Sequence, residues 1–145
     1  MRLVVQADAF EIGAESSRFT AGAVGAGAIV TFTGLVRDTG GLAAMEIEHY
    51  SGMTERAISA MMDQAQTRWS LTDALVIHRF GRLQPRAPIM MVATAAPHRA
   101  AAFAAAEFLM DYLKSRAPFW KKEISASGTT WVAAKDSDEA ALARW

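Results

Sequence analysis

The chain has 145 residues, of which 52% are hydrophobic and 21% charged, and this composition is typical of one ordinary globular domain spanning residues 1–145. Its 15 basic and 15 acidic residues give a formal net charge of zero, so no overall field attracts nucleic acid or an anionic membrane. Any binding site for an anion must therefore be local.

Cysteine is absent, which excludes disulfides, thiolate nucleophiles and cysteine metal sites. The histidines show no metal-ligand spacing, so we expect no metal and no other cofactor, and we interpret His49 and His78 as structural residues. No apolar run approaches the ~20 residues of a membrane span and the N-terminus shows no signal-peptide pattern, so we expect a cytoplasmic protein.

In chain order, residues 2–6 predict a short strand and residues 12–19 a short helix. Glycines at positions 22, 25 and 27 precede the β-rich run 28–36 instead of opening a helix, so they do not form a dinucleotide-binding loop. We interpret that run as a central strand. Arg37, at its end, is placed to offer a planar guanidinium to a ligand.

The middle of the chain predicts three more strands and a helix. Residues 42–50 alternate apolar and polar side chains, which indicates a half-buried strand. A helix follows from Met53, with Thr54 as its cap and apolar residues at helical spacing. Two buried strands are expected over residues 75–80 and 89–95.

The longest predicted helix covers residues 99–116. Its apolar residues recur at three-four spacing, so we expect a sheet-facing side that carries Phe103, Ala106, Met110 and Leu113. Its N-terminus offers free backbone amides and a partial positive charge, with His98 and Arg99 beside them. This end of the helix is a candidate anion site.

The stretch MDYLKSRAPFWKKE, residues 110–123, places Lys114 and Lys121 on either side of a proline bend. Pro118 cannot donate a backbone hydrogen bond and restricts the residue before it, so the helix should end there and a strand should leave in a new direction. The bend can bring both amines to one space. Two close ammonium groups repel each other, which lowers the proton affinity of at least one and suits an anionic ligand.

The two cationic ends of this helix lie about 22–27 Å apart at 1.5 Å per residue, too far for one pocket. Either Arg99 and Lys114 serve different parts of an extended site, or a second copy of the chain supplies one of them. We favour the second copy.

The C-terminal part predicts a β-hairpin from residues 120–125 and 129–134, then a short helix that begins at residue 136, 137 or 138. Strand alternation puts Glu123 on the face of Lys121. Two interpretations stay open there: Glu123 hydrogen-bonds and orients the lysine, or it forms an ordinary surface ion pair. Spacing alone thus predicts an α+β domain with a lysine-rich anion pocket.

Several long strings closely resemble the family of the molybdopterin synthase large, catalytic subunit, and they occur in order from about Gly27 to Arg144 and Trp145. They are VTFTGLVRD (30–38), EHYSGMTERA (48–57), VIHRFGRL (76–83), PHR (97–99) and MDYLKSRAPFWKKE. One departure is Arg86, which follows Pro85 where the family commonly has glycine.

The resemblance implies an α/β-hammerhead fold with an additional antiparallel β subdomain, and a homodimer at the core of a heterotetramer. It also implies a small ubiquitin-like sulfur-carrier subunit whose Gly-Gly C-terminus, as a thiocarboxylate, enters a pocket of the large subunit. Two sulfurs would pass to cyclic pyranopterin monophosphate and form the dithiolene of molybdopterin. A chain without cysteine fits this role, because the sulfur arrives on the partner.

By resemblance, Lys114 matches the lysine nearest the carrier terminus and Lys121 the second lysine of the pocket, which makes them the expected catalytic residues. The residues that match the phosphate-holding and pocket-lining positions are Arg37, His98 and Arg99, and those that match the apolar wall are Phe32 and Met110. An ammonium near a thiocarboxylate stabilises its charge and the oxyanion that develops, and can donate a proton.

Two other functions remain open at this point. Lys114 could form a Schiff base with a phosphorylated carbonyl compound. Alternatively, a nucleic-acid-binding module could use the cations Arg99, Arg116, Lys121 and Lys122, although zero net charge disfavours it.

Overall fold

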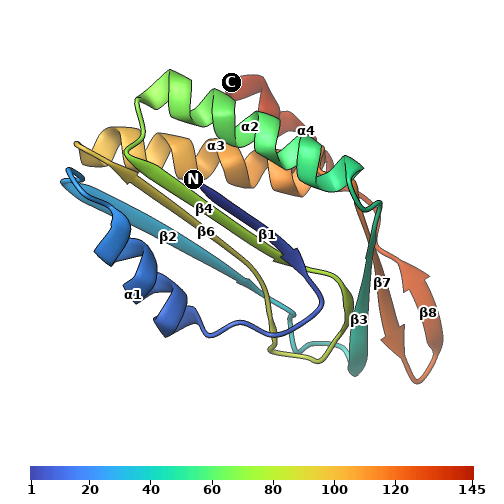
Figure 1. Ribbon diagram of the computed structural model, residues 1–145. Coiled ribbons are helices and arrows are strands. Elements are labelled where there is room, and N and C mark those ends of the chain that lie inside the picture. Colours follow the sequence, from blue (N-terminus) through green and yellow to red (C-terminus); the bar gives the residue numbers. More distant parts are fainter.

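Two four-stranded sheets form the framework of the chain, whose computed structural model describes all residues 1–145 (Figure 1). Sheet A has the order β1-β4-β6-β2, in which β1 runs parallel to β4 and the other neighbours are antiparallel. Its strands are β1 (Arg2–Gln6), β2 (Ala28–Leu35), β4 (Asp73–Arg79) and β6 (Pro88–Ala96). Sheet B is antiparallel in the order β5-β3-β7-β8 and consists of β3 (Leu42–His49), β5 (Gly81–Leu83), β7 (Phe119–Ser125) and β8 (Gly128–Trp131).

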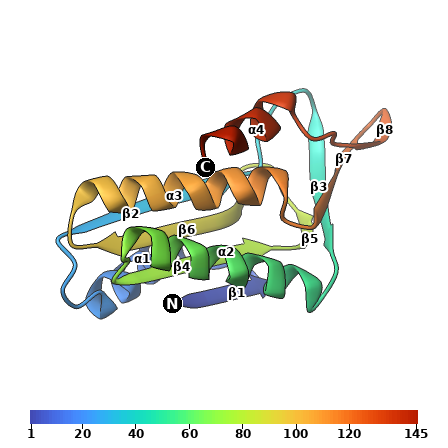
Figure 2. The ribbon, with the colours of Figure 1, turned by 90° about the horizontal axis from the view of Figure 1, so that it is seen from above.

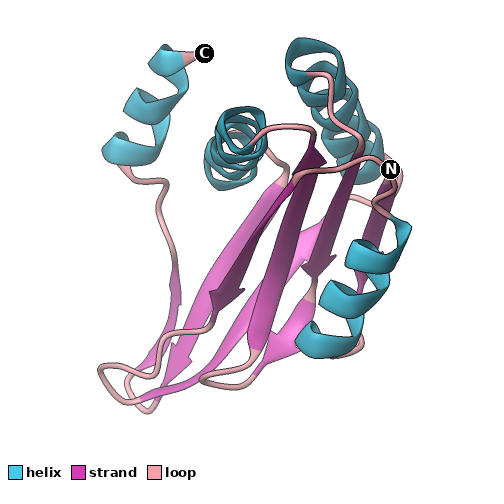
Figure 3. Cartoon of the chain, turned by 90° about the vertical axis from the view of Figure 1, so that its left-hand side faces the viewer, coloured by secondary structure: helices cyan, strands magenta, loops and turns pink.

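Two long helices cover one face of sheet A. The first, α2 (Met53–Trp69), packs over β1 and β4, and the second, α3 (Arg99–Ser115), packs over β6 and β2 (Figure 1). The shorter α1 (Ile12–Gly22) lies against the opposite face (Figure 3). The last helix, α4 (Asp136–Ala141), continues into a 3-10 turn (Leu142–Arg144) and lies along the outside of α3 (Figure 2). None of these helices is both long and apolar enough to cross a membrane.

The strands β4 and β6 form the centre of the core because both of their faces are covered. On β4, Leu75 and Ile77 pack with Phe19 of α1, whereas Ala74 and Val76 pack beneath α2 and α3. A strand buried on both faces reads as an apolar run without alternation, which is the pattern of both segments. The mixed architecture confirms the predicted α+β class, and sheet B is the predicted antiparallel subdomain.

The strand β2 lies at the edge of sheet A, so its prediction as a central strand was wrong. It pairs only with β6, and side chains on its length are exposed, among them Phe32 (38%) and Leu35 (52%). An apolar run indicates a strand but does not indicate its neighbours, which are decided by the whole sheet. The edge therefore presents an unpaired, partly apolar surface.

The sheet-facing side of α3 is formed mainly by small residues rather than by Phe103, which is 61% exposed. The buried stripe is Ala102, Ala105, Ala106, Phe108, Leu109 and Leu113. Alanines allow the helix backbone to approach the sheet closely, and the helix is rotated so that Phe103 points away. The predicted face was therefore correct for Ala106 and Leu113 and wrong for Phe103.

The N-cap of α2 is Gly52 and not the predicted Thr54. Gly52 has a positive φ of 80°, which glycine adopts without strain, and its N–H donates to the Glu55 carboxylate at 2.6 Å. Thr54 is fully buried in the first turn, where its hydroxyl donates to the carbonyl oxygen of Tyr50 at 3.0 Å.

Arg86 adopts a backbone conformation that glycine adopts more easily. Its φ is +71°, in the left-handed region, and its N–H donates to the Val36 carbonyl oxygen at 2.8 Å. A non-glycine residue in this region is strained by its Cβ, so a preference for glycine at this position has a backbone cause.

Gly27 lies where the chain enters β2, and a substitution there tests how tightly the backbone packs. A Cβ at this position would lie 2.4 Å from the carbonyl oxygen of Pro97, a backbone atom that cannot move aside. We expect Gly27→Ala to destabilise the protein by about 1–3 kcal/mol, measured by urea denaturation. Gly13→Ala, in α1 with no atom within 4 Å of the new Cβ, is the control and should stabilise by about 0.5–1 kcal/mol. Equal stability of the two variants would contradict the close approach.

Candidate functional site

The proline bend brings Lys114 and Lys121 to one cavity of about 220 Å³. Lys114 is on the last turn of α3, which ends at Ser115, and the amides of Arg116 and Ala117 both donate to the carbonyl oxygen of Tyr112. Strand β7 begins directly after Pro118 and pairs with β3, which fixes the direction in which Lys121 points. Helix end and strand pairing together place the two amines.

The cavity is cationic although the whole chain is neutral. Its polar lining holds four cationic side chains and one carboxylate, which are Arg37, Lys114, Lys121, Lys135 and Glu123, together with Thr39. Its apolar lining is Leu35, Leu42, Met45, Ile89 and Val132. Apolar walls lower the local dielectric, so the excess of positive charge acts more strongly on an anion here than it would in water.

Burial lowers the pKa of Lys121, and the ammonium of Lys114 lowers it further, while the Asp138 carboxylate partly opposes both effects. This lysine therefore loses its proton more readily than a lysine in water. A lowered pKa is what proton transfer near neutral pH requires.

A second hollow of about 160 Å³ adjoins the first and shares Lys114, Lys121, Val132 and Lys135 with it. Residues 132–135, which we call the wall segment, therefore stand between the two hollows. The Val132 N–H donates to the Lys121 carbonyl oxygen at 2.8 Å, which holds the start of the wall segment beside β7. Asp138, on α4, lines the second hollow only.

Sequence reasoning missed Lys135 and Asp138. The predicted strand over residues 129–134 ends at Trp131 in the structure, so the wall segment leaves the sheet and crosses the lysines. No local pattern indicated this, because the path depends on where α4 docks.

Glu123 lines the cavity, but neither of the two contacts considered for it, an orienting hydrogen bond to Lys121 or a surface ion pair, is formed. No hydrogen bond or ion pair joins the two side chains, and the carboxylate that raises the pKa of Lys121 is that of Asp138. Residues two apart on a strand share a face, yet their side chains need not point toward each other.

The remaining predicted residues lie outside the cavity of this single chain. His98 and Arg99 are at the other end of α3, roughly 25 Å away at 1.5 Å per residue. Met110 packs partly buried against the main core, and Phe32 is exposed on the β2 edge. A site that combines all of them requires more than one copy of the chain.

Beneath Lys121, an aromatic stack supports the start of β7. The Phe119 ring lies 3.7 Å from the His78 ring, centroid to centroid, with the planes almost parallel. His78 is fully buried, and its Nδ1 lies 2.8 Å from the Arg79 carbonyl oxygen, to which it donates. Burial lowers the pKa of His78 to about 3, with smaller contributions from Lys121 and His49, so this ring is neutral. The structural interpretation of His78 agrees with these contacts.

No group of three or more His, Cys, Asp or Glu side chains is arranged to hold a metal ion. A larger hollow of about 400 Å³ is lined only by exposed α2 residues, namely Asp63, Gln64, Thr67 and Arg68. The surface of a single helix does not enclose a ligand, so the lysine cavity remains the candidate site.

Residues 5–116 match the family model described as MoaE protein. The chain belongs to the MoaE family. A relative from Cereibacter sphaeroides, named molybdopterin synthase catalytic subunit, is 73% identical over the full length of both chains. A relative of the same name from Ralstonia nicotianae is 54% identical over 97% of this chain and 82% of its own length. The likeness therefore includes the residues before Gly27.

Solved MoaE structures share the fold. The molybdopterin biosynthesis MoaE protein from Burkholderia ambifaria is 49% identical, with a TM-score of 0.85 over 99% of this chain and 96% of its own. The molybdopterin synthase from Staphylococcus aureus is 30% identical, with a TM-score of 0.81 over 92% of this chain and 98% of its own. Family membership supports sulfur transfer over the Schiff-base and nucleic-acid alternatives.

The interaction between the two cavity lysines can be measured directly. Lys114→Gln removes the like charge beside Lys121, so we expect the pKa of Lys121 to rise, as followed by NMR titration of the lysine side chains. Lys122→Gln is the control, because Lys122 lies on the other face of β7 and pairs with Glu48 at 2.7 Å. An unchanged Lys121 titration in Lys114→Gln would show that the ammonium groups do not interact.

The neutral His78 predicts a loss of stability in acid. Its folded-state pKa of about 3 lies below the ordinary value of 6.5, so the unfolded chain binds more protons between these values. The free energy of unfolding should therefore fall as pH drops from about 6.5 toward 3, by up to about 1.4 kcal/mol per pH unit from this group. Urea denaturation of wild type and His78→Phe at pH 6.5, 5.5 and 4.5 measures the difference. Parallel pH dependences would contradict the assignment.

Proposed function

We propose that this chain is the catalytic subunit of a molybdopterin synthase, with the lysine cavity as its active site. It transfers two sulfurs to cyclic pyranopterin monophosphate, one from each of two C-terminal thiocarboxylates of a small carrier subunit, forming the dithiolene. The observation that carries the proposal is that Lys114 and Lys121 meet in one cationic cavity in a MoaE chain. The chain has no cysteine, so no cysteine of its own carries the sulfur, and a carrier subunit fits this composition.

Lys114 is the main electrostatic and acid-base residue in this proposal. A thiocarboxylate is negatively charged and its reaction develops an oxyanion, and an ammonium at hydrogen-bond distance stabilises both. Lys121 assists, and its lowered pKa supports a part in donating a proton to the departing oxygen. Glu123 is a supporting residue that balances part of the positive charge.

The pterin phosphate is held by a planar guanidinium group rather than by a metal. Arg37 lines the cavity and offers paired donors to phosphate oxygens, and Lys135 adds a charge from the wall segment. We propose that His98 and Arg99 reach the same substrate from a second copy of the chain, because they lie at the far end of α3 within one copy.

An exposed apolar surface supports the homodimer. Phe32 and Leu35 on the open edge of β2 and Phe103 on the adjoining α3 are all exposed. Apolar side chains gathered on neighbouring elements favour contact with another protein surface. In the dimer, Phe32 and Met110 would form the apolar wall of the pterin site.

The other partner is a small ubiquitin-like sulfur carrier with a Gly-Gly C-terminus, and the assembly is a heterotetramer around the homodimer. A structural neighbour from Helicobacter pylori is a complex of subunits 1 and 2 of molybdopterin-converting factor, although at 18% identity it shows the fold alone. No nucleic acid, membrane or cofactor takes part, and the proposed location is the cytoplasm.

Substitution of the lysines tests the active site. With thiocarboxylated carrier and cyclic pyranopterin monophosphate, we expect Lys114→Ala to lower the rate of molybdopterin formation by about 10²–10³-fold, because a charge that stabilises the oxyanion is lost. Lys121→Ala should have a smaller effect. Lys122→Ala is the matched control and should keep the wild-type rate, since Lys122 faces away from the cavity and pairs with Glu48. A wild-type rate for Lys114→Ala would remove its assigned role.

A further inference from the structure

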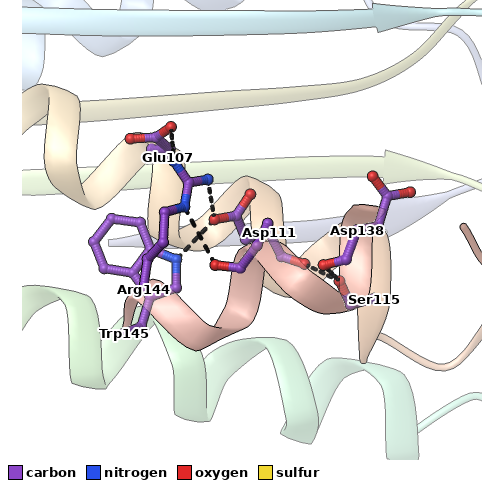
Figure 4. Close-up of polar contacts among 7 residues, drawn as sticks. Glu107, Asp111, Ser115, Asp138, Arg144 and Trp145 are labelled. Atoms are coloured by element: carbon purple, nitrogen blue, oxygen red, sulfur yellow. Dashed lines mark hydrogen bonds and ion pairs between the residues drawn. The ribbon is translucent and has the colours of Figure 1, made fainter. Parts of the chain in front are cut away.

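The C-terminal residues are fixed to the outer face of α3 by a compact group of polar contacts (Figure 4). Arg144 donates from Nη1 to Glu107 at 2.6 Å and from Nη2 to Asp111 at 2.7 Å. The Trp145 indole N–H donates to the same Asp111 oxygen at 2.7 Å. We call Glu107, Asp111, Arg144 and Trp145 the C-terminal clamp.

The clamp also has an apolar side, which joins α2 to α3. The Trp145 ring lies 5.6 Å from the rings of both Trp69 and Phe108, nearly perpendicular to each. Arg68 of α2 donates to the Trp145 carbonyl oxygen at 3.1 Å. The Asp111 side chain is only 15% exposed and accepts two donors, so its hydrogen bonds are better protected from water than those of an ordinary surface ion pair.

Helix α4 connects the clamp to the lysine cavity. The Ser115 hydroxyl, one residue after Lys114, lies 2.7 Å from each of the carbonyl oxygens of Asp111 and Asp138, and its single hydrogen is shared between these two acceptors (Figure 4). Arg116 pairs with Glu139 at 2.9 Å, but both side chains are well exposed and contribute little. The start of α4 is therefore held at the level of Lys114.

The wall segment itself has few contacts of its own. Val132 is bonded to β7 through its N–H, but neither Ala133 nor Ala134 takes part in a backbone hydrogen bond. The segment is thus held at its two ends, by Val132 and by α4. Its position over Lys114 and Lys121 depends on where α4 is docked.

We propose that the C-terminal clamp is a positioning device for the active site: by docking α4 it fixes the wall segment, and so sets Lys135 and Asp138 against Lys114 and Lys121. The residues of the C-terminal clamp touch no substrate and act through the wall segment. This inference rests on the proposed function for its kinetic readout alone.

The clamp controls only some of the charges that face Lys121. Lys114 on α3, Glu123 on β7, Arg37 after β2 and the neutral His78 on β4 keep their places without it, whereas Lys135 and Asp138 do not. Loss of the clamp should therefore weaken binding of the anionic substrate and leave the transfer step at Lys114 almost intact.

The test compares Arg144→Gln, Asp111→Asn and Trp145→Phe, which keeps an aromatic ring but loses the indole N–H and the second ring of the indole. Glu48→Gln is the control, because it breaks an exposed ion pair with Lys122 on sheet B, away from the clamp. Hydrogen exchange of the hydrogen-bonded amides of Val132, Asp138 and Glu139 and steady-state kinetics with cyclic pyranopterin monophosphate are measured in the full chain with its thiocarboxylated carrier.

In each clamp variant we expect about tenfold faster exchange at Asp138 and Glu139, whose N–H groups donate to the Lys135 carbonyl oxygen at the end of the wall segment, and an about tenfold higher KM, with kcat within about twofold of wild type. The double variant Arg144→Gln with Asp111→Asn should resemble the single variants, because both changes break one unit. The control should match wild type in both measurements.

Unchanged exchange at Asp138 and Glu139 in Arg144→Gln and Trp145→Phe would overturn the proposal, and so would faster exchange with an unchanged KM or with an equal loss of kcat. If the wild-type chain transfers no sulfur, the proposed function fails. The exchange measurement would still decide whether the clamp holds the wall segment.

Discussion

The candidate site of this chain depends on two ammonium groups that the fold holds in one cavity against their mutual repulsion. Pro118 ends α3 just after Lys114. The next strand, β7, pairs with β3, and this pairing fixes Lys121, two residues after the start of β7, on the inward face. Burial and like charge make Lys121 easier to deprotonate. The packing that enforces this arrangement, including the Phe119 stack on a neutral His78, therefore serves both the fold and the site.

The lysine pair can attract an anion to one place because its cavity is cationic and apolar-walled, whereas the whole chain has no net charge. A molecule with zero net charge places four of its 15 cationic side chains in one apolar-walled cavity, which attracts an anion locally without drawing polyanions to its whole surface. Part of that cavity is built by the wall segment from the C-terminal region. The segment is held in place by contacts on the far side of α3, so residues remote from the chemistry decide how complete the cavity is.

The open edge of β2 adds a second requirement. Phe32 and Phe103 are exposed in one copy, and His98 and Arg99 lie a helix length from the lysines. The proposal of a pterin site assembled between two copies accounts for both features. A single chain provides the lysine half of the site, and its exposed apolar surface provides the reason to associate.

The sequence by itself determined the order of the helices and strands, the end of α3 at Pro118 and the meeting of Lys114 with Lys121, because proline geometry and side-chain periodicity act over a few residues. Only the tertiary structure decided that β2 is an edge strand, that Phe103 faces outward and that Lys135 enters the cavity with Asp138 nearby. These features depend on which strands pair, how a helix rotates on a sheet and where a distant tail docks. Such choices are made between segments far apart in the chain, and no local pattern encodes them.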